Sequence, residues 1–114
     1  MQPDRLIDLV HLDSQTLGDA ALARELLSLF EAQCLRLLPG IRDASLSAEA
    51  RADHAHTLKG SALGVGAAQI AAQSAAVEDV LRTRGAVEDT ELDALARAVD
   101  ATLVEIEELA ASRR

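Results

Sequence analysis

Apolar residues recur at helical spacing along most of this sequence, and most of them are alanine or leucine. The longest stripe, whose members lie mostly three or four positions apart, comprises Leu22, Leu26, Leu29, Phe30, Gln33, Leu37 and Ile41. Such spacing places side chains on one face of an α-helix. The chain has 23 Ala and 19 Leu but one Phe and no Tyr or Trp. Because Ala and Leu favour helix whereas aromatic and β-branched residues favour sheet, the sequence predicts an all-α fold.

Turn signals divide the 114 residues into five helical segments. Pro3 suits the first turn of a short initial helix, which is expected to end near residues 11–14. Four longer helices are expected at about 19–44, 48–63, 67–84 and 90–111. In the first of these a kink, not an end, is expected at Pro39, because the apolar stripe continues beyond it. Since short links favour antiparallel neighbours, we expect one domain over 1–114: an antiparallel up-down four-helix bundle with a short extra N-terminal helix.

Charge and composition exclude several classes of function. Eleven Lys and Arg against 19 Asp and Glu give a net charge of −8, which argues against binding to nucleic acid or to an anionic membrane surface. No apolar run approaches a membrane span, and the N-terminus lacks the apolar core of a signal peptide, so a cytoplasmic protein is expected. Cys34 is the single cysteine and is expected in the core, and with three His no metal pattern is visible. No cofactor of its own is expected.

One histidine has unusual neighbours. His56, Lys59 and Gly60 share a helix face beside a core stripe, because offsets of three and four are neighbours on a helix. Lys59 is the only lysine in the chain. A glycine inside a helix costs about 0.5–1 kcal/mol relative to alanine, so Gly60 indicates a need for space.

These residue types suit a phosphohistidine site. A neutral imidazole nitrogen is a good nucleophile near pH 7. Lys59 would disfavour the imidazolium and attract phosphoryl oxygens, and Gly60 would leave room for a partner. The sequence has no Walker-type loop and no glycine-rich phosphate cradle. The phosphoryl group would therefore come from another protein, and the chain is expected to be a carrier and not a kinase.

The segment His56-Thr57-Leu58-Lys59-Gly60-Ser61, with Gly66-Ala67 beyond it, closely resembles the signature of histidine-containing phosphotransfer (HPt) domains. The resemblance extends to most of the chain, including residues 26–30 and 67–84. It implies a four-helix bundle whose second bundle helix exposes a histidine that takes a phosphoryl group from a receiver-domain aspartate and passes it to another. It assigns His56 as acceptor, Lys59 as electrostatic support and Gly60 as clearance for the partner. The implied partners are response-regulator receiver domains and a hybrid histidine kinase, with Mg²⁺ on the receiver.

The chain departs from the family pattern at one position. Family members often carry a polar side chain, commonly Gln, on the next helix, where it hydrogen-bonds the imidazole. The matching offset from His56 points to Glu78. A carboxylate there would orient the ring but favour the imidazolium, opposing Lys59. Gln73 and Ser74 are the alternatives.

Other charged and titratable residues have ordinary interpretations. His11 and His54 lack supporting neighbours and are expected to be solvated. Glu105, Glu107 and Glu108 are expected to form a solvated face near the chain end.

Three functions fit the sequence. The leading hypothesis is a monomeric phosphorelay intermediate whose receiver docks on an apolar rim beside His56, including Ala52 and Leu63. The second is a helical module that binds receivers without phosphate chemistry. The third is a receiver phosphatase, in which His56 and a nearby carboxylate such as Asp53 would orient water.

Overall fold

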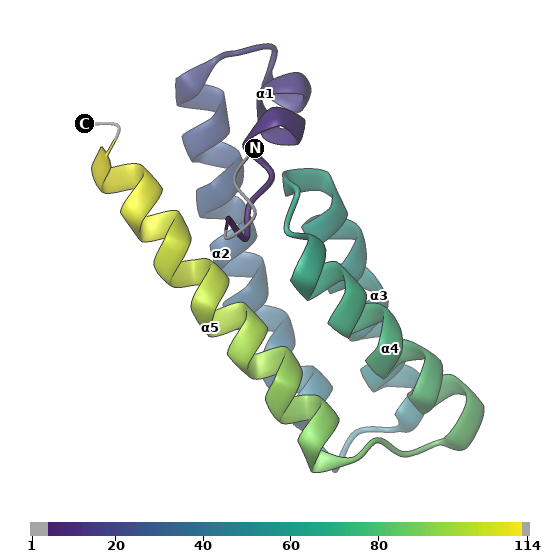
Figure 1. Cartoon of the computed structure of the whole chain (residues 1–114). Helices are drawn as coiled ribbons and strands as arrows, with labels where there is room; N and C mark the ends of the chain where they lie inside the picture. Colours follow the sequence, from purple (N-terminus) through teal and green to yellow (C-terminus); the bar gives the residue numbers. More distant parts are fainter. Residues whose placement is uncertain (1–4, 113–114) are drawn as a thin grey trace.

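The computed structural model describes residues 5–112 as an assembly of five α-helices (Figure 1). They are α1 (Leu9–Thr16), α2 (Ala20–Arg42), α3 (Ala48–Val65), α4 (Ala68–Arg84) and α5 (Asp89–Ser112). No strand forms within the described residues, and a single isolated bridge pairs Ile7 with Ala67. The prediction of an all-α fold is confirmed.

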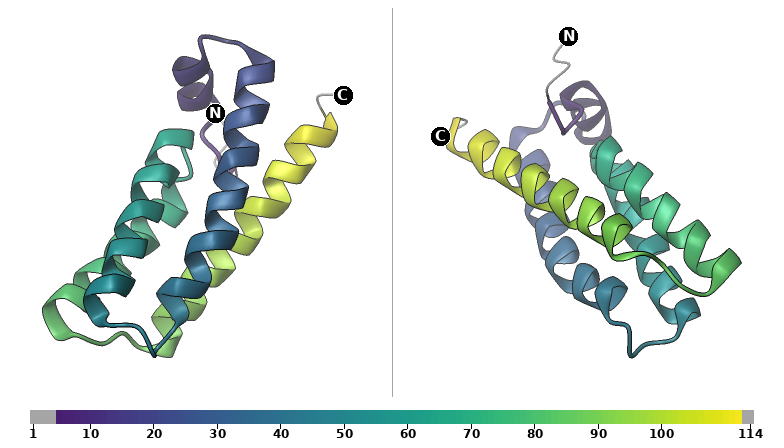
Figure 2. Two further views of the ribbon diagram at one scale, coloured as in Figure 1. Left: turned by 180° about the vertical axis from the view of Figure 1, so that it is seen from behind. Right: turned by 60° about the horizontal axis from the view of Figure 1, so that its bottom comes forward.

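Helices α2 to α5 run alternately down and up the long axis of the molecule (Figures 1 and 2). Helices α3 and α4 lie side by side, α2 packs on the other side of α3, and α5 contacts both α2 and α4. Helix α1 contacts α2 and α3 at the end where α2 begins and α3 ends. This is the expected antiparallel bundle with an extra N-terminal helix.

Caps fix where the helices begin and end. The Asp19 carboxylate and the Ser47 hydroxyl accept backbone N–H groups at the start of α2 and α3, and each satisfies a donor that has no partner within its helix. Gly66 and Gly85 end α3 and α4 with φ of 82° and 73°, a region that favours glycine. Because Ser47 and Gly66 set the bounds of α3, His56 lies in the middle of that helix.

The core is built from leucine, isoleucine, valine and small alanine side chains that all four long helices contribute. Cys34 is buried among them, as the sequence predicts. Burial raises the pKa of its thiol to about 12. Arg51 is also buried, and its Nε donates a 2.8 Å hydrogen bond to the carbonyl of Ile41 at the end of α2. None of the helices in the described range is long and apolar enough to cross a membrane.

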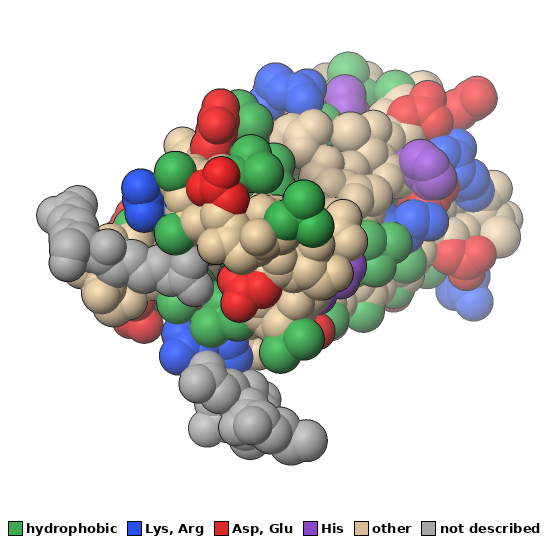
Figure 3. Space-filling view, turned by 90° about the horizontal axis from the view of Figure 1, so that it is seen from above, with side chains coloured by type: hydrophobic (Ala, Val, Ile, Leu, Met, Phe, Trp, Pro, Cys, Tyr) green, Lys and Arg blue, Asp and Glu red, His purple; other side chains and the backbone are tan. Residues whose placement is uncertain are grey.

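The first helix begins later than the sequence suggested. The expected start at Pro3 lies outside the described residues, and residues 5–8 are not helical. They lie over the turn between α3 and α4, where the Asp8 N–H donates to the Gly66 carbonyl at 2.9 Å. Asp8 then caps α1 by accepting the His11 N–H. Hydrophobic and acidic side chains lie exposed together on this end of the molecule (Figure 3).

Glu105 is not part of a solvated face, contrary to the sequence prediction. Its carboxylate is half-buried and accepts the backbone N–H groups of Leu6 and Ile7 at 2.9 and 2.6 Å. Neither N–H group donates to a backbone carbonyl within residues 5–112, so each needs a side-chain acceptor. Glu105 therefore fixes the N-terminal segment to α5.

Helix α2 does not end at Pro39 but continues to Arg42, two residues short of the expected end. Beside the proline, Gly40 leaves room for a side chain of α3. A Cβ atom at this position would lie 2.8 Å from Cδ2 of His54.

The two histidines expected to be solvated are partly buried. The His54 ring packs over Gly40, which removes part of its surface from water. His11 lies on α1 with its Nε2 enclosed and without a hydrogen-bond partner among the described residues. For His54 the cover comes from packing of α3 against α2, which the local sequence does not show.

Candidate functional site

His56 lies on the outer face of α3, halfway along the helix. Its neighbours Ala55 and Leu58 are buried in the core, whereas the imidazole side chain is 61% exposed. The sequence expectation of an exposed ring beside a core stripe matches this arrangement. The ring is therefore accessible to another protein.

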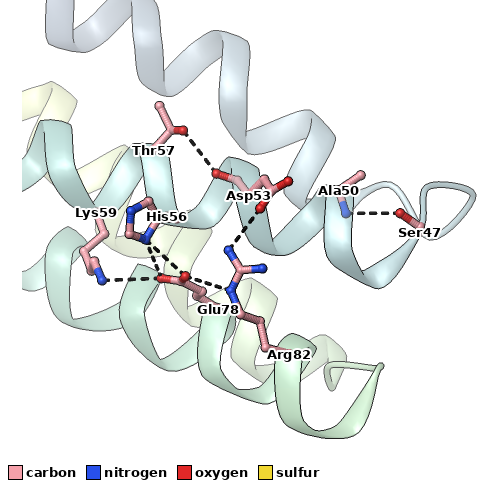
Figure 4. Close-up of polar contacts among 8 residues, drawn as sticks. All are labelled: Ser47, Ala50, Asp53, His56, Thr57, Lys59, Glu78 and Arg82. Atoms are coloured by element: carbon pink, nitrogen blue, oxygen red, sulfur yellow. Dashed lines mark hydrogen bonds and ion pairs between the residues drawn. The ribbon is translucent and has the colours of Figure 1, made fainter.

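Glu78 extends from α4 to the imidazole (Figure 4). Nδ1 of His56 lies 3.2 Å from Oε1 and 3.1 Å from Oε2 of Glu78. An ionised carboxylate only accepts hydrogen bonds, so Nδ1 carries the proton of the neutral ring. The lone pair then lies on Nε2, which hydrogen-bonds no described residue. Glu78 holds the ring in the tautomer that leaves Nε2 as a nucleophile.

Lys59 and Arg82 complete the surroundings of the Glu78 carboxylate. Nζ of Lys59 lies 3.4 Å from Oε1, and Nε of Arg82 lies 2.9 Å from Oε2. The other end of the Arg82 guanidinium contacts Asp53, with NH2 3.0 Å from Oδ1. A chain of contacts thus runs from Lys59 through Glu78 and Arg82 to Asp53.

The Glu78 carboxylate stays ionised in this setting. Its side chain is only 13% exposed, and this burial raises its pKa. Hydrogen bonds from Arg82 and His56, with electrostatic attraction to the His56 ring and to Lys59, outweigh burial and hold the pKa of Glu78 below its ordinary value of 4.5. The site therefore presents an anion to Nδ1 at neutral pH.

Gly60 lies one turn beyond His56 on the same face. A Cβ atom added there would meet nothing within 4 Å. Packing against the rest of the molecule therefore does not require a glycine at this position. The missing side chain leaves open space beside the imidazole.

The site thus combines a nucleophilic imidazole nitrogen, two cations and cleared space on one exposed helix face. A family model described as the Hpt domain matches residues 23–112. The chain belongs to the Hpt domain family. No curated protein and no solved structure matches it.

Hpt domains perform histidine phosphotransfer in phosphorelays, as carriers and not kinases, and interact with receiver domains and histidine kinases. The matched range runs from the first turn of α2 to the end of α5, so it contains His56, Lys59, Gly60 and Glu78. Helix α1 precedes it. The described residues contain no cluster of three or more side chains that could hold a metal ion.

Two residues considered as alternatives to Glu78 do not orient the ring of this Hpt domain. Ser74 is buried in the core, and its hydroxyl has no hydrogen-bond partner among the described residues. Gln73 makes no hydrogen bond to His56 in the described part of the chain. The residue at the family offset makes the contact instead.

One residue of the expected docking rim lies elsewhere. Ala52 is fully buried, so it cannot contact a partner. Its position on α3 is on the core side of His56. Leu63 is 57% exposed and can contact a partner protein.

The sequence analysis missed two residues of the site. Arg82 lies four positions after Glu78 on α4. This spacing favours an ion pair between the two side chains, so the sequence contains the signal that could have identified Arg82. Gly64 lies four positions after Gly60, is exposed, and like Gly60 has nothing within 4 Å of an added Cβ. The helix expected from the sequence ends at residue 63, before this glycine, whereas α3 extends to Val65. His56, Gly60 and Gly64 therefore follow one another along a strip with little side-chain bulk.

Proposed function

We propose that this Hpt domain is a phosphorelay intermediate that accepts a phosphoryl group on Nε2 of His56 from one receiver-domain aspartate and passes it to another. One contact supports this function above all: the Glu78 carboxylate binds Nδ1 and thereby leaves the lone pair on the exposed nitrogen. A histidine that served only to bind a partner would not need a fixed tautomer.

Phosphoryl transfer to His56 needs only the imidazole and the groups around it. The Nε2 lone pair attacks phosphorus, the bond between phosphorus and the aspartyl oxygen breaks, and the aspartate leaves as a carboxylate. The ring becomes formally cationic while Nδ1 keeps its proton, and the adjacent Glu78 anion stabilises that charge. Lys59 adds a positive charge beside the phosphoryl oxygens, which lowers the energy of a transition state rich in negative charge. The return step is the reverse with a second aspartate.

The surface around His56 suits a protein donor better than a small molecule. Gly60 and Gly64 have no side chains that protrude from the His56 face of α3, so a partner can approach the helix closely. The exposed Leu63 side chain adds apolar area for contact. A receiver can approach until its aspartyl phosphate reaches Nε2. The proposal includes Mg²⁺ on the receiver and a monomeric carrier in the cytoplasm.

The phosphatase alternative receives less support. Its water-orienting carboxylate was Asp53, whose Oδ1 is held by Arg82 at 3.0 Å. That oxygen already accepts a hydrogen bond from the guanidinium, so the carboxylate has less capacity left to orient a water molecule.

The test is transfer from a labelled receiver. A receiver domain carrying a radiolabelled aspartyl phosphate is mixed with the chain, and the label is expected on the chain in an acid-labile, base-stable form. His56→Gln should abolish labelling without changing the helical circular dichroism signal. His54→Gln, on the same helix, is the matched control and should be labelled like the parent.

Three results would contradict the proposal. Label on the His56→Gln variant would mean that another residue is the acceptor. Faster loss of phosphate from the receiver without label on the chain would indicate the phosphatase. Binding of the receiver with neither effect would indicate an interaction module.

A further inference from the structure

Arg82 contacts both carboxylates that lie around His56, and it does so from the neighbouring helix (Figure 4). Its Nε donates to Oε2 of Glu78 at 2.9 Å, and its NH2 donates to Oδ1 of Asp53 at 3.0 Å. One guanidinium thus links α4 to α3 at the site. Arginine is suited to this because its donors are rigidly held in one plane.

Glu78 has two opposite effects on the proposed nucleophile. By accepting a hydrogen bond from Nδ1–H it leaves the lone pair on Nε2. Its negative charge also favours the imidazolium, which carries a proton on Nε2 and is no longer a nucleophile. The first effect helps the proposed reaction and the second opposes it. Their balance depends on how far other groups neutralise the carboxylate.

The charges around the imidazole come from two helices. Helix α3 contributes Asp53 and Lys59, and helix α4 contributes Glu78 and Arg82. Helix α2, which also packs on α3, adds no ion pair or hydrogen bond to this cluster within residues 5–112. With His56 neutral, the two acids and two bases cancel. Without Arg82 the cluster carries one net negative charge, and the imidazolium becomes the favoured form over a wider pH range.

We infer that Arg82 is a positioning residue for phosphotransfer: it holds the Glu78 carboxylate against Nδ1 of His56 and offsets the negative charge by which that carboxylate favours protonation of Nε2. This inference rests on the proposed function of His56. Arg82 does not contact the imidazole and acts through Glu78.

The test compares Arg82→Gln with a charge-matched control. Arg84→Gln removes the same charge from the same helix, and Arg84 is exposed and makes no ion pair in the described part of the chain. The small donor phosphoramidate is used, so that receiver docking plays no part. For the parent, the rate at which phosphoramidate labels His56 should fall at acidic pH as the imidazolium forms. We call this fall the acid limb of the labelling rate. For Arg82→Gln this acid limb should move to higher pH by roughly 0.5 unit or more. For Arg84→Gln it should not move.

A second measurement does not depend on phosphoryl transfer. Nitrogen-15 NMR of the imidazole reports which ring nitrogen carries the proton and the pH at which the second one binds. Arg82→Gln should lower the fraction of neutral rings with the proton on Nδ1 and shift the ring titration to higher pH. Arg82→Lys should restore the titration, because it restores the charge, but not the tautomer, because an ammonium lacks the planar donor pair.

An Arg82→Gln variant with the parent's tautomer, titration and acid limb would overturn the inference. So would a change of the same size in Arg84→Gln. If phosphoramidate and receivers fail to label even the parent, the proposed function is wrong, and the NMR comparison still decides whether Arg82 controls the ring.

Discussion

The imidazole of His56 and the carboxylate of Glu78 form a hydrogen-bonded pair across the interface of α3 and α4, with Nδ1 3.1 Å from Oε2. The pair joins a largely exposed ring to a largely buried acid. At this offset the family often has glutamine, which would orient the ring without a charge. The carboxylate also stabilises positive charge on the ring, both in the imidazolium and in the phosphorylated ring.

Glu78→Gln separates orientation from charge. The amide oxygen can still accept a hydrogen bond from Nδ1–H, but the negative charge is lost. We expect the acid limb of the labelling rate to move to lower pH by roughly 0.5–1 unit, because the imidazolium loses its counterion. The rate at neutral pH should fall, because the ring cation formed by phosphorylation is less stabilised. An acid limb that stays in place would show that the Glu78 charge does not act on the ring.

Glu78 also predicts how stability changes in acid. Its pKa in the folded chain lies below the ordinary value of 4.5. A lowered folded pKa contributes stability that is present above the unfolded value and is lost as pH falls through the folded one. Urea melts of the parent should therefore show a loss of unfolding free energy below about pH 4.5 that is smaller in Glu78→Gln. Glu108→Gln, a change at an exposed glutamate of α5, should lose stability like the parent. Equal losses in all three chains would contradict the prediction.

Lys59→Ala should change the pH dependence of labelling and also slow phosphoryl transfer itself. Removing the cation 3.4 Å from Oε1 of Glu78 leaves the cluster with a net negative charge, so the acid limb should move to higher pH. Removing a charge that faces the phosphoryl group should also slow transfer by roughly tenfold or more on the neutral plateau. Lys59→Arg should keep the acid limb in place. A plateau unchanged in Lys59→Ala would mean that Lys59 acts on the ring alone.

Leu63→Asp tests the docking surface. Leu63 is largely exposed on the His56 face of α3, so the change should alter unfolding free energy by no more than about 0.5 kcal/mol. Receiver binding, measured by calorimetry, should weaken because a charge replaces apolar contact area. Val104→Asp is the matched control, since Val104 is similarly exposed on α5. Equal receiver affinity in all three chains would exclude Leu63 from the interface.

Local sequence rules predicted the helices and the grouping of His56, Lys59 and Gly60, because both depend on spacing within one helix. They also pointed across to Glu78, through a family offset and not through geometry. The same spacing rule also predicts the contact of Arg82 with Glu78, four positions earlier on α4. The second contact of Arg82, with Asp53, depends on the packing of α3 against α4 and cannot be read from spacing.

The remaining differences arise where distant segments meet. The Glu105 carboxylate is half-buried because the N-terminal segment passes over α5 and offers two unpaired N–H groups. His54 is covered because Gly40, on another helix, leaves space for its ring. Neither partner is near in sequence, so no periodicity can reveal it.

The contrast between Gly60 and Gly40 leads to a prediction about stability. Both glycines lie in helices, but only at Gly40 would an added Cβ atom meet another side chain, that of His54. Gly60→Ala adds a Cβ in open space, so it should raise the unfolding free energy by about 0.5–1 kcal/mol. Gly40→Ala places a Cβ 2.8 Å from Cδ2 of His54 and should lower it, because the ring must move out of its packed position. In a His54→Ala background the cost of Gly40→Ala should disappear.

Gly60→Gln tests whether the open space at this glycine serves the fold or the approach of a partner. Glutamine favours helix, so the variant should be at least as stable as the parent. Helical side chains lean towards the N-terminus, so this one would extend over the turn that bears His56. Transfer from the receiver should fall steeply, because the aspartyl phosphate can no longer reach Nε2, whereas labelling by phosphoramidate should persist, because that donor is small. A variant that is less stable, or that loses both donors equally, would show that Gly60 serves the fold of α3 and not the approach of a partner.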